Sequence, residues 1–348
     1  MLENPMFFYH EVRDLLNHEM PDDDTRLKMR DPDARLHDMI HRAAFGFNGL
    51  GNSSFYHSND TLHTEHLEEF YHSHFLPSYS FALTSSSDES LANSLPMLFQ
   101  TLSSKESALK ERRKEHSENA RQAATECYID ETVNFVKFAY TFSFAHSQSE
   151  EKDRLKDFIA LRILKEAFRC FRTEYFHSPS IFNKFILAET TISPRDYIVE
   201  PILHEYDTHS LLSVKFSVYN KPHVSSLVRA AKKFFANIHE ILPKSDCDAP
   251  KSKAVNRKSK TISESGELFE KLKLNLKYSE FGQKETNCEV TQMNVRPLFL
   301  LGEAGLDFIE NLDVVDEKYI FENIVGRVGN QKPCFVALGD CKYLENSY

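Results

Sequence analysis

The sequence predicts an α+β fold, a sandwich in which helices pack on one face of a sheet. Two stretches alternate apolar and polar or small side chains with the period of a strand, and each is followed by apolar residues at helical spacing. The length of 348 residues is more than one domain of about 100–200 residues usually holds. We therefore expect two domains, each with its own hydrophobic core.

The composition is that of an ordinary globular protein and excludes several classes. Apolar residues make up 41% of the chain and charged residues 27%, which excludes collagen-like, coiled-coil and wholly disordered chains. With 42 basic and 52 acidic side chains the net charge is −10, which argues against a general nucleic-acid binder. The six cysteines show no C-x-x-C spacing, so we expect no disulfide framework, no cysteine zinc site and a reducing compartment.

In the first part of the chain the clearest element is a helix that begins at Asp31-Pro32. Aspartate is a favoured N-cap, and proline suits the first helical position. The helix is predicted to end at Gly46, after an apolar stripe of Leu36, Met39, Ile40, Ala43 and Ala44. Further along, the pattern predicts helices at 65–75 and 90–102 and a short strand at 79–83.

The second part of the chain holds the alternating stretches. Half-buried strands are predicted at 138–144 and 212–218, where apolar residues occupy every second position. A helix is predicted after each of them, at 155–167 and at 222–238. A final apolar strand is predicted at 334–338.

Two polar segments are expected to lie outside the packed domains. Residues 103–126 leave almost no apolar face, and we interpret them as a charged, solvated helical linker. Residues 243–266 are polar and basic and are predicted to form a disordered surface insertion. Such an insertion could contact an acidic partner or lipid headgroups, but a solvated loop is the interpretation we favour.

The sharpest candidate for a chemical motif is His37-Asp38-Met39-Ile40-His41. Two histidines at positions i and i+4 share one face of a helix, which suits zinc, and zinc peptidases place a general-base Glu directly after the first His. Here that position holds the shorter Asp38, and no neighbouring motif supplies a third ligand. We interpret the pair as part of an ordinary amphipathic helix. An independent zinc peptidase built on His37 and His41 stays as an alternative.

A second group of histidines lies between 57 and 74, with Glu65 and Glu69 nearby, and we interpret it as a solvated face; its members are His57, His63, His66, His72 and His74. No G-x-G-x-x-G, Walker, G-x-S-x-G or C-x-x-C sequence occurs, and the ten glycines are too sparse for a phosphate cradle. No nucleophile and base can be paired from spacing alone. The chemistry visible in the sequence predicts a non-catalytic pair of domains.

Several patches nevertheless resemble a known family. Residues 36–45, followed by Asn48, Gly51, Phe55 and the sequence His74-Phe75-Leu76-Pro77, form the first of them. Met293-Asn294-Val295-Arg296-Pro297 and the strand within 332–340 form the others. These patches resemble the alpha subunit of mitochondrial processing peptidase and the core proteins of respiratory complex III, which belong to the pitrilysin/insulinase superfamily. The resemblance implies α/β sandwich domains with helices on mainly antiparallel sheets.

The departures from the family are as informative as the matches. Catalytic members carry H-x-x-E-H on an early helix and a distal Glu as third zinc ligand. Glu19, in Asn17-His18-Glu19-Met20, matches the distal position, but the H-x-x-E-H would lie upstream of the sequence. We therefore expect no catalytic, cofactor-binding or metal-binding residues. The comparison implies a partial first family domain at 1–102, with its first half lost or supplied by another polypeptide, and a second family domain at 127–348.

The resemblance implies a place in the mitochondrion, on the matrix side of the inner membrane. The expected function is a non-catalytic, alpha-type core subunit of complex III, packed against a beta-type partner and the membrane subunits. No stretch reaches the roughly 18 apolar residues of a membrane span, and no targeting peptide is visible.

Two other roles stay open. One alternative is the alpha subunit of the processing peptidase, assisting a zinc-bearing beta subunit, although the stretch 167–201 lacks the glycines of that subunit's presequence-handling loop. Another is an interaction protein of a different mitochondrial assembly, docked through the basic residues of 244–260.

Overall fold

The computed structural model describes residues 31–47, 49–52, 124–130, 133–146, 151–169, 171–173, 176–178, 181–206, 208–241, 259–281, 297–298, 300–301, 305 and 308–344. The elements predicted between residues 65 and 102, the histidines at 57–74 and Glu19 lie outside these ranges. Within the described ranges, no helix combines the length and the hydropathy that crossing a membrane requires.

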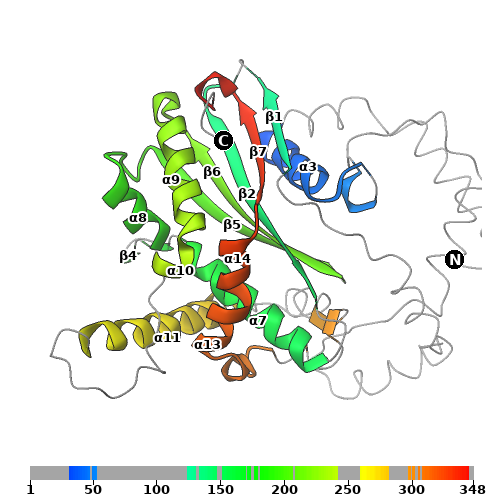
Figure 1. Cartoon of the computed structure of the whole chain (residues 1–348), viewed down its shortest axis with the longest axis vertical. Coiled ribbons are helices and arrows are strands. Elements are labelled where there is room, and N and C mark those ends of the chain that lie inside the picture. Colours follow the sequence, from blue (N-terminus) through cyan, green and yellow to red (C-terminus); the bar gives the residue numbers. More distant parts are fainter. Residues whose placement is uncertain are drawn as a thin grey trace, which may run out of the picture.

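The centre of the fold is a five-stranded sheet with the order β1-β7-β2-β6-β5 (Figure 1). Its strands are β1 (Thr125–Ile129), β2 (Val136–Ala145), β5 (Tyr197–Glu205), β6 (His209–Val218) and β7 (Cys334–Gly339). Only β1 and β7 run parallel, and every other pair is antiparallel. The α+β prediction with a mainly antiparallel sheet is therefore confirmed.

One face of the sheet is covered by α7 (Glu151–Phe168), α8 (Ile181–Glu189) and α9 (Val224–Ala236). From Phe138 to Phe144 every second residue of β2 contributes an aromatic ring to this side, and Phe138 stacks on Phe216 of β6 at 4.6 Å between ring centroids. Phe182 of α8 then bridges Phe216 and Phe234, a residue of α9, at 5.0 Å from each. The predicted helices and strands in this layer are confirmed.

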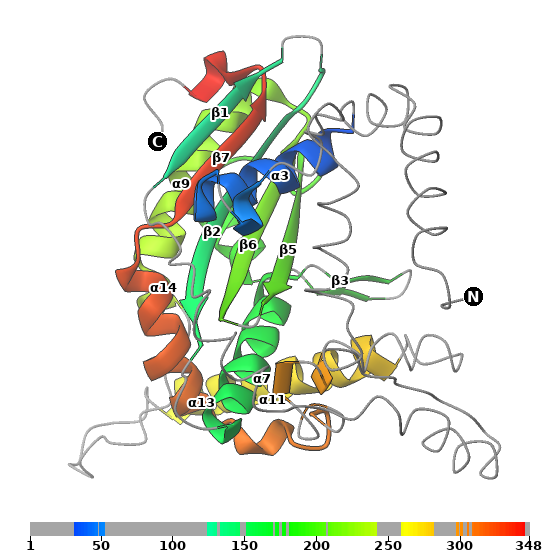
Figure 2. The ribbon, with the colours of Figure 1, turned by 90° about the vertical axis from the view of Figure 1, so that its right-hand side faces the viewer.

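The opposite face is covered by α3 (Pro32–Phe45), as Figure 2 shows with α3 in front of the sheet and α9 behind it. Asp31 caps the helix by accepting a hydrogen bond from the Asp33 N–H at 3.0 Å. Gly46, at φ 86°, ends it and donates its N–H to the carbonyl of Arg42 at 2.8 Å. The apolar stripe of α3 packs on a second core whose sheet residues are Ala139, Leu211, Cys334, Val336 and Leu338.

The position of α3 corrects one expectation about the sheet. We predicted half-buried strands with helices on one face, but β6 is buried along its whole length and β2 along most of it. Because α3 packs on the second face, the small residues between the aromatic ones are buried as well.

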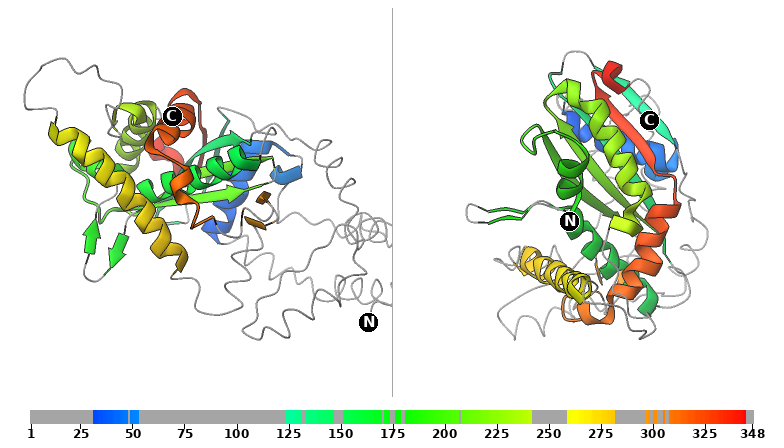
Figure 3. Two further views of the ribbon diagram at one scale, coloured as in Figure 1. Left: turned by 90° about the horizontal axis from the view of Figure 1, so that it is seen from below. Right: turned by 60° about the vertical axis from the view of Figure 1, so that its left-hand side comes forward.

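Two other boundaries differ from the expectation. Helix α11 (Ser259–Phe281) begins inside the segment predicted to be a disordered insertion, 243–266. Its residues Leu268, Phe269 and Leu272 line a pocket together with residues of α7. Figure 3 shows α11 beside α7, and the helix extends backward from this anchored part through polar sequence. Strand β1 begins at Thr125, where the sequence predicts the end of a helical linker.

The remaining elements are short. The stretch 167–201 contains the hairpin of β3 (Phe171–Thr173) and β4 (Phe176–Ser178) in addition to α8. The other short elements are η1 (Gly49–Gly51), η4 (Lys221–His223), α10 (Ile238–Ile241), η6 (Leu312–Val314), α13 (Glu317–Tyr319), η7 (Ile320–Val325), α14 (Gly326–Asn330) and η8 (Cys341–Leu344).

Candidate metal centre

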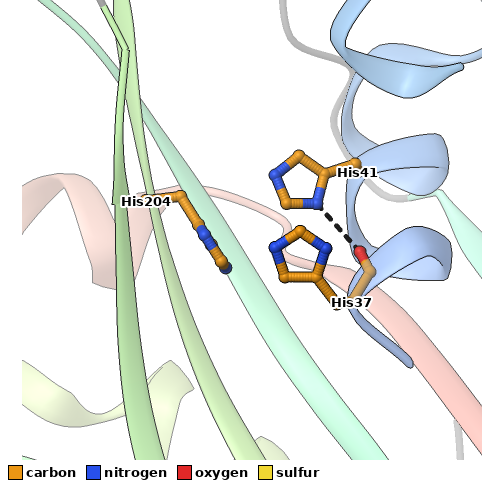
Figure 4. Close-up of side chains that lie close together, drawn as sticks. All are labelled: His37, His41 and His204. Carbon is orange, nitrogen blue, oxygen red and sulfur yellow. Dashed lines mark hydrogen bonds between the residues drawn. The ribbon is translucent and has the colours of Figure 1, made fainter. Parts of the chain in front are cut away.

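Three histidines, two from α3 and one from the distant strand β5, meet where α3 crosses the sheet. His37 and His41 lie on one face of α3, and His204 lies near the end of β5 (Figure 4). One ring nitrogen of each lies within 4.8 Å of the other two. The spacing of the helical pair follows from the helix itself, since residues i and i+4 are neighbours on its surface.

The three imidazole rings form a nearly equilateral triangle. The ring centroids of His37 and His41 are 4.3 Å apart, and His204 lies 4.8 Å from His37 and 4.7 Å from His41. The ring of His204 stands at 78° and 71° to the other two, which are tilted by 34° to each other. His204 therefore reaches toward the pair on α3 from the facing strand, as Figure 4 shows.

The orientation of His41 is fixed at both ring nitrogens. Its Nδ1 lies 2.8 Å from the carbonyl oxygen of His37. Because a carbonyl oxygen only accepts, Nδ1 carries the proton and Nε2 carries the lone pair. The hydroxyl of Tyr206 donates a hydrogen bond to that Nε2. The lone pair of His41 is thus aimed away from α3, toward β5 and the residue that follows it.

The surroundings lower the pKa of both helical histidines. Burial lowers the pKa of His41, against the hydrogen bond to His37 and the charge of Asp38, which both favour protonation. Partial burial and the neighbouring His41 lower the pKa of His37, again against Asp38. Both shifts favour the neutral ring. A neutral imidazole is the form that binds a metal ion.

The centre is open on one side. His41 is 5% exposed, whereas His37 is exposed and His204 is partly buried. A small ion can therefore approach the centre from the side of His37. Three neutral imidazoles suit Zn²⁺ and neighbouring divalent transition metals rather than Mg²⁺ or Ca²⁺, which prefer oxygen ligands.

An ion-pair network lies on the other side of β5 from the histidines. Arg162 of α7 donates two hydrogen bonds of 3.0 Å to the carboxylate of Glu205 and one of 3.1 Å to Glu280 of α11. Its guanidinium also lies 4.2 Å from the ring centroid of Phe158 and 4.6 Å from that of Phe308. Burial opposes the charge of Arg162, but Glu205 and Glu280 outweigh it and raise the pKa of Arg162. The guanidinium therefore stays charged and joins two helices and a strand.

The sequence indicated two of the three histidines. The spacing of His37 and His41 is visible in the sequence, but His204 is not, because β5 was not predicted and contains Pro201. Proline is tolerated there since β5 is an edge strand paired only with β6 in this sheet. Glu19 and the histidines at 57–74 lie outside the described residues. The expectation that the chain has no catalytic, cofactor-binding or metal-binding residues stays a prediction.

No model of a protein family matches the sequence, and no protein of curated function matches it. Solved structures do match. One is a chain of complex III2 from Candida albicans with Inz-5 bound, at 9% identity, 97% coverage of this chain, 76% of that chain and a TM-score of 0.63. Another is described as an M16-like peptidase from Alicyclobacillus acidocaldarius. It is 11% identical, the match covers 95% of this chain and 70% of that chain, and the TM-score is 0.55. This protein therefore has the pitrilysin-like fold.

Proposed function

We propose that this protein is a non-catalytic, alpha-type core subunit of mitochondrial respiratory complex III. The observation that carries the proposal is the similarity to a chain of complex III2 over 97% of the sequence, at a TM-score of 0.63. In this role the protein lies on the matrix side of the inner membrane and packs against a beta-type subunit and the membrane subunits. Residues 1–102 then correspond to part of a first family domain and 127–348 to a second.

The chemistry of the chain supports a structural role. The sequence contains no H-x-x-E-H, the zinc motif of catalytic family members. The stretch 167–201 contains no glycine, and its helix α8 buries Phe182 and Ile186 in the main core. A segment anchored in this way is unlike a glycine loop, which depends on backbone freedom. These features favour packing over handling a mobile peptide.

The edge of the sheet at β1 offers a surface for the partner. Ile129 is 63% exposed and Phe47, beyond the end of α3, is 74% exposed; Tyr128 and Leu50 are exposed as well. The guanidinium of Arg35 lies 4.7 Å from the ring centroid of Tyr128, and that of Arg42 lies 5.9 Å from that of Phe47. We call the four exposed apolar residues Phe47, Leu50, Tyr128 and Ile129 the edge patch. Exposed apolar patches beside an unpaired strand edge are typical of protein interfaces.

The test is purification of the tagged protein from its own membranes in mild detergent, with mass spectrometry of the chains that accompany it. We expect cytochrome b, cytochrome c₁ and a beta-type subunit to co-purify in stoichiometric amounts. Recovery of the protein only as a free monomer would contradict the proposal.

A second candidate function is the alpha subunit of a processing peptidase, with zinc in its beta partner. The similarity to a protein described as an M16-like peptidase, at a TM-score of 0.55, is the observation that favours it. Recovery of a soluble complex with a beta-type chain alone would point to this role. A presequence-cleavage assay with and without this protein then decides, because a true alpha subunit is required for cleavage by its partner.

A further inference from the structure

We propose that His37, His41 and His204 together bind one divalent transition-metal ion such as Zn²⁺. The bound ion joins α3 to β5. A core subunit does not need such a site, so this inference goes beyond the proposed function. It also differs from the zinc site of the catalytic family members, because none of the three residues belongs to an H-x-x-E-H or matches the distal Glu.

The geometry requires only a small closure. Tetrahedral zinc with Zn–N bonds of about 2.0–2.1 Å places its nitrogen ligands about 3.3 Å apart. The three donor nitrogens already lie within 4.8 Å of one another. His37 is exposed, so its ring has room to rotate about its side-chain bonds, whereas His41 is buried and already oriented. The site therefore has one fixed ligand on α3 and one adjustable ligand beside it, with His204 facing both from β5.

The surroundings of His41 are those of a metal ligand. Ligating histidines almost always donate their second ring N–H to a carbonyl or a carboxylate, which orients the ring and fixes its tautomer. The hydrogen bond from Nδ1 of His41 to the carbonyl of His37 has this role. Asp38 is buried in the same turn and favours positive charge on both helical histidines, so it also favours a bound cation. Metal binding at Nε2 replaces the hydrogen bond from Tyr206.

The ion would connect two elements that are distant along the chain. α3 comes from the N-terminal segment, and β5 comes from the edge of the sheet formed by the second segment. Apart from this meeting point, α3 packs mainly on β7 and β2. A metal ion that binds only the folded arrangement stabilises it in proportion to the logarithm of its concentration above the dissociation constant.

The experiment measures metal binding by the full chain, produced without a polyhistidine tag and stripped with a chelator. Zn²⁺ is titrated against a chromogenic competitor, and Co²⁺ is titrated as a spectroscopic probe whose visible absorption reports tetrahedral nitrogen ligation. We expect one tight equivalent of either metal per chain. His37→Gln and His204→Gln should each weaken that site more than about tenfold.

Matched variants separate this site from other histidines. His223→Gln, in the short helix η4, should leave the affinity unchanged, and so should His63→Gln and His66→Gln in the first segment. Thermal unfolding with and without Zn²⁺ gives a second readout: the metal should raise the Tm of the parent chain but not that of His204→Gln.

Three outcomes would overturn the proposal. The first is that the parent chain binds no tight equivalent of metal. The second is that His37→Gln and His204→Gln bind the metal as tightly as the parent. The third is that binding is lost only in His63→Gln or His66→Gln. Circular dichroism of each variant verifies that a lost site is not a lost fold. Because the titration uses the isolated chain, its failure leaves the co-purification test of the proposed function unaffected.

Discussion

His204 and Glu205 are consecutive residues of β5, and their side chains lie on opposite faces of the sheet. His204 reaches α3 and its two histidines, while Glu205 accepts two hydrogen bonds from Arg162 of α7. The alternation of a strand places neighbouring residues on opposite sides, so one edge strand holds a helix in place on each face.

The pair of Glu205 and Arg162 should be essential for stability. The Glu205 side chain is 5% exposed and that of Arg162 is 14% exposed, so Glu205→Gln leaves a buried cation with only Glu280 as a charged partner. We expect the free energy of unfolding to fall by about 3 kcal/mol. Urea denaturation measures it.

The control for this prediction is the exposed pair of Lys318 and Glu322, whose side chains are 59% and 63% exposed. Glu322→Ala should cost less than about 1 kcal/mol. A loss in Glu205→Gln as small as that of the control would contradict a structural role for the network.

Acid should weaken the attachment of α3 through Asp33. Its carboxylate accepts hydrogen bonds from Lys137 and from Lys215, the latter at 2.8 Å. Although burial opposes them, these lysines lower the pKa of Asp33 below 3.8. A lowered pKa contributes stability that is present above the unfolded value and lost as pH falls through the folded one. The parent should therefore lose stability below about pH 4 more steeply than Asp33→Asn, as pH-dependent denaturation will measure. Identical acid slopes would refute the assignment.

Glu166 should have the opposite pH dependence. Burial raises its pKa, and its Oε2 has no hydrogen-bond partner among the described residues. A raised pKa contributes stability that is present below the unfolded value and lost as pH rises through the folded one. Glu166→Met should therefore stabilise the protein by about 1 kcal/mol at pH 7 and by less at pH 4. The loss of the ion pair with Glu166 costs Arg169 little, because the Arg169 side chain is 42% exposed. Equal effects at both pH values would contradict this account.

The edge patch should be needed for assembly and not for folding. Ile129→Glu places a charge in the surface that we expect the beta-type subunit to cover. Co-purification with that subunit should weaken by at least about tenfold, while the Tm of the isolated chain stays unchanged. Leu187→Glu, at an apolar residue of α8 that is 49% exposed and lies on the far side of the sandwich, is the matched control. If both variants assemble like the parent, the edge patch is not the interface.

The sequence allowed the local elements to be predicted, but not how they meet. The Asp31-Pro32 start and Gly46 end of α3, and the alternation in β2 and β6, are local signals, and the structure confirms them. That α3 packs on β7 depends on contacts between residues nearly 300 positions apart, as in the 3.7 Å contact of the Cys334 thiol with the Ala43 carbonyl. No spacing rule gives such pairs, so the second buried face and the place of His204 could not be predicted.

The insertion of β7 between β1 and β2 has a consequence for how the chain folds. Among the described strands β1 pairs with β7 alone, and α3 makes much of its apolar contact with Cys334, Val336 and Leu338. Neither element can complete its packing until residues 334–339 have been synthesised and have left the ribosome. Assembly that waits for so distant a strand is expected to be slow, and the unfinished sheet edge is a natural client for chaperones.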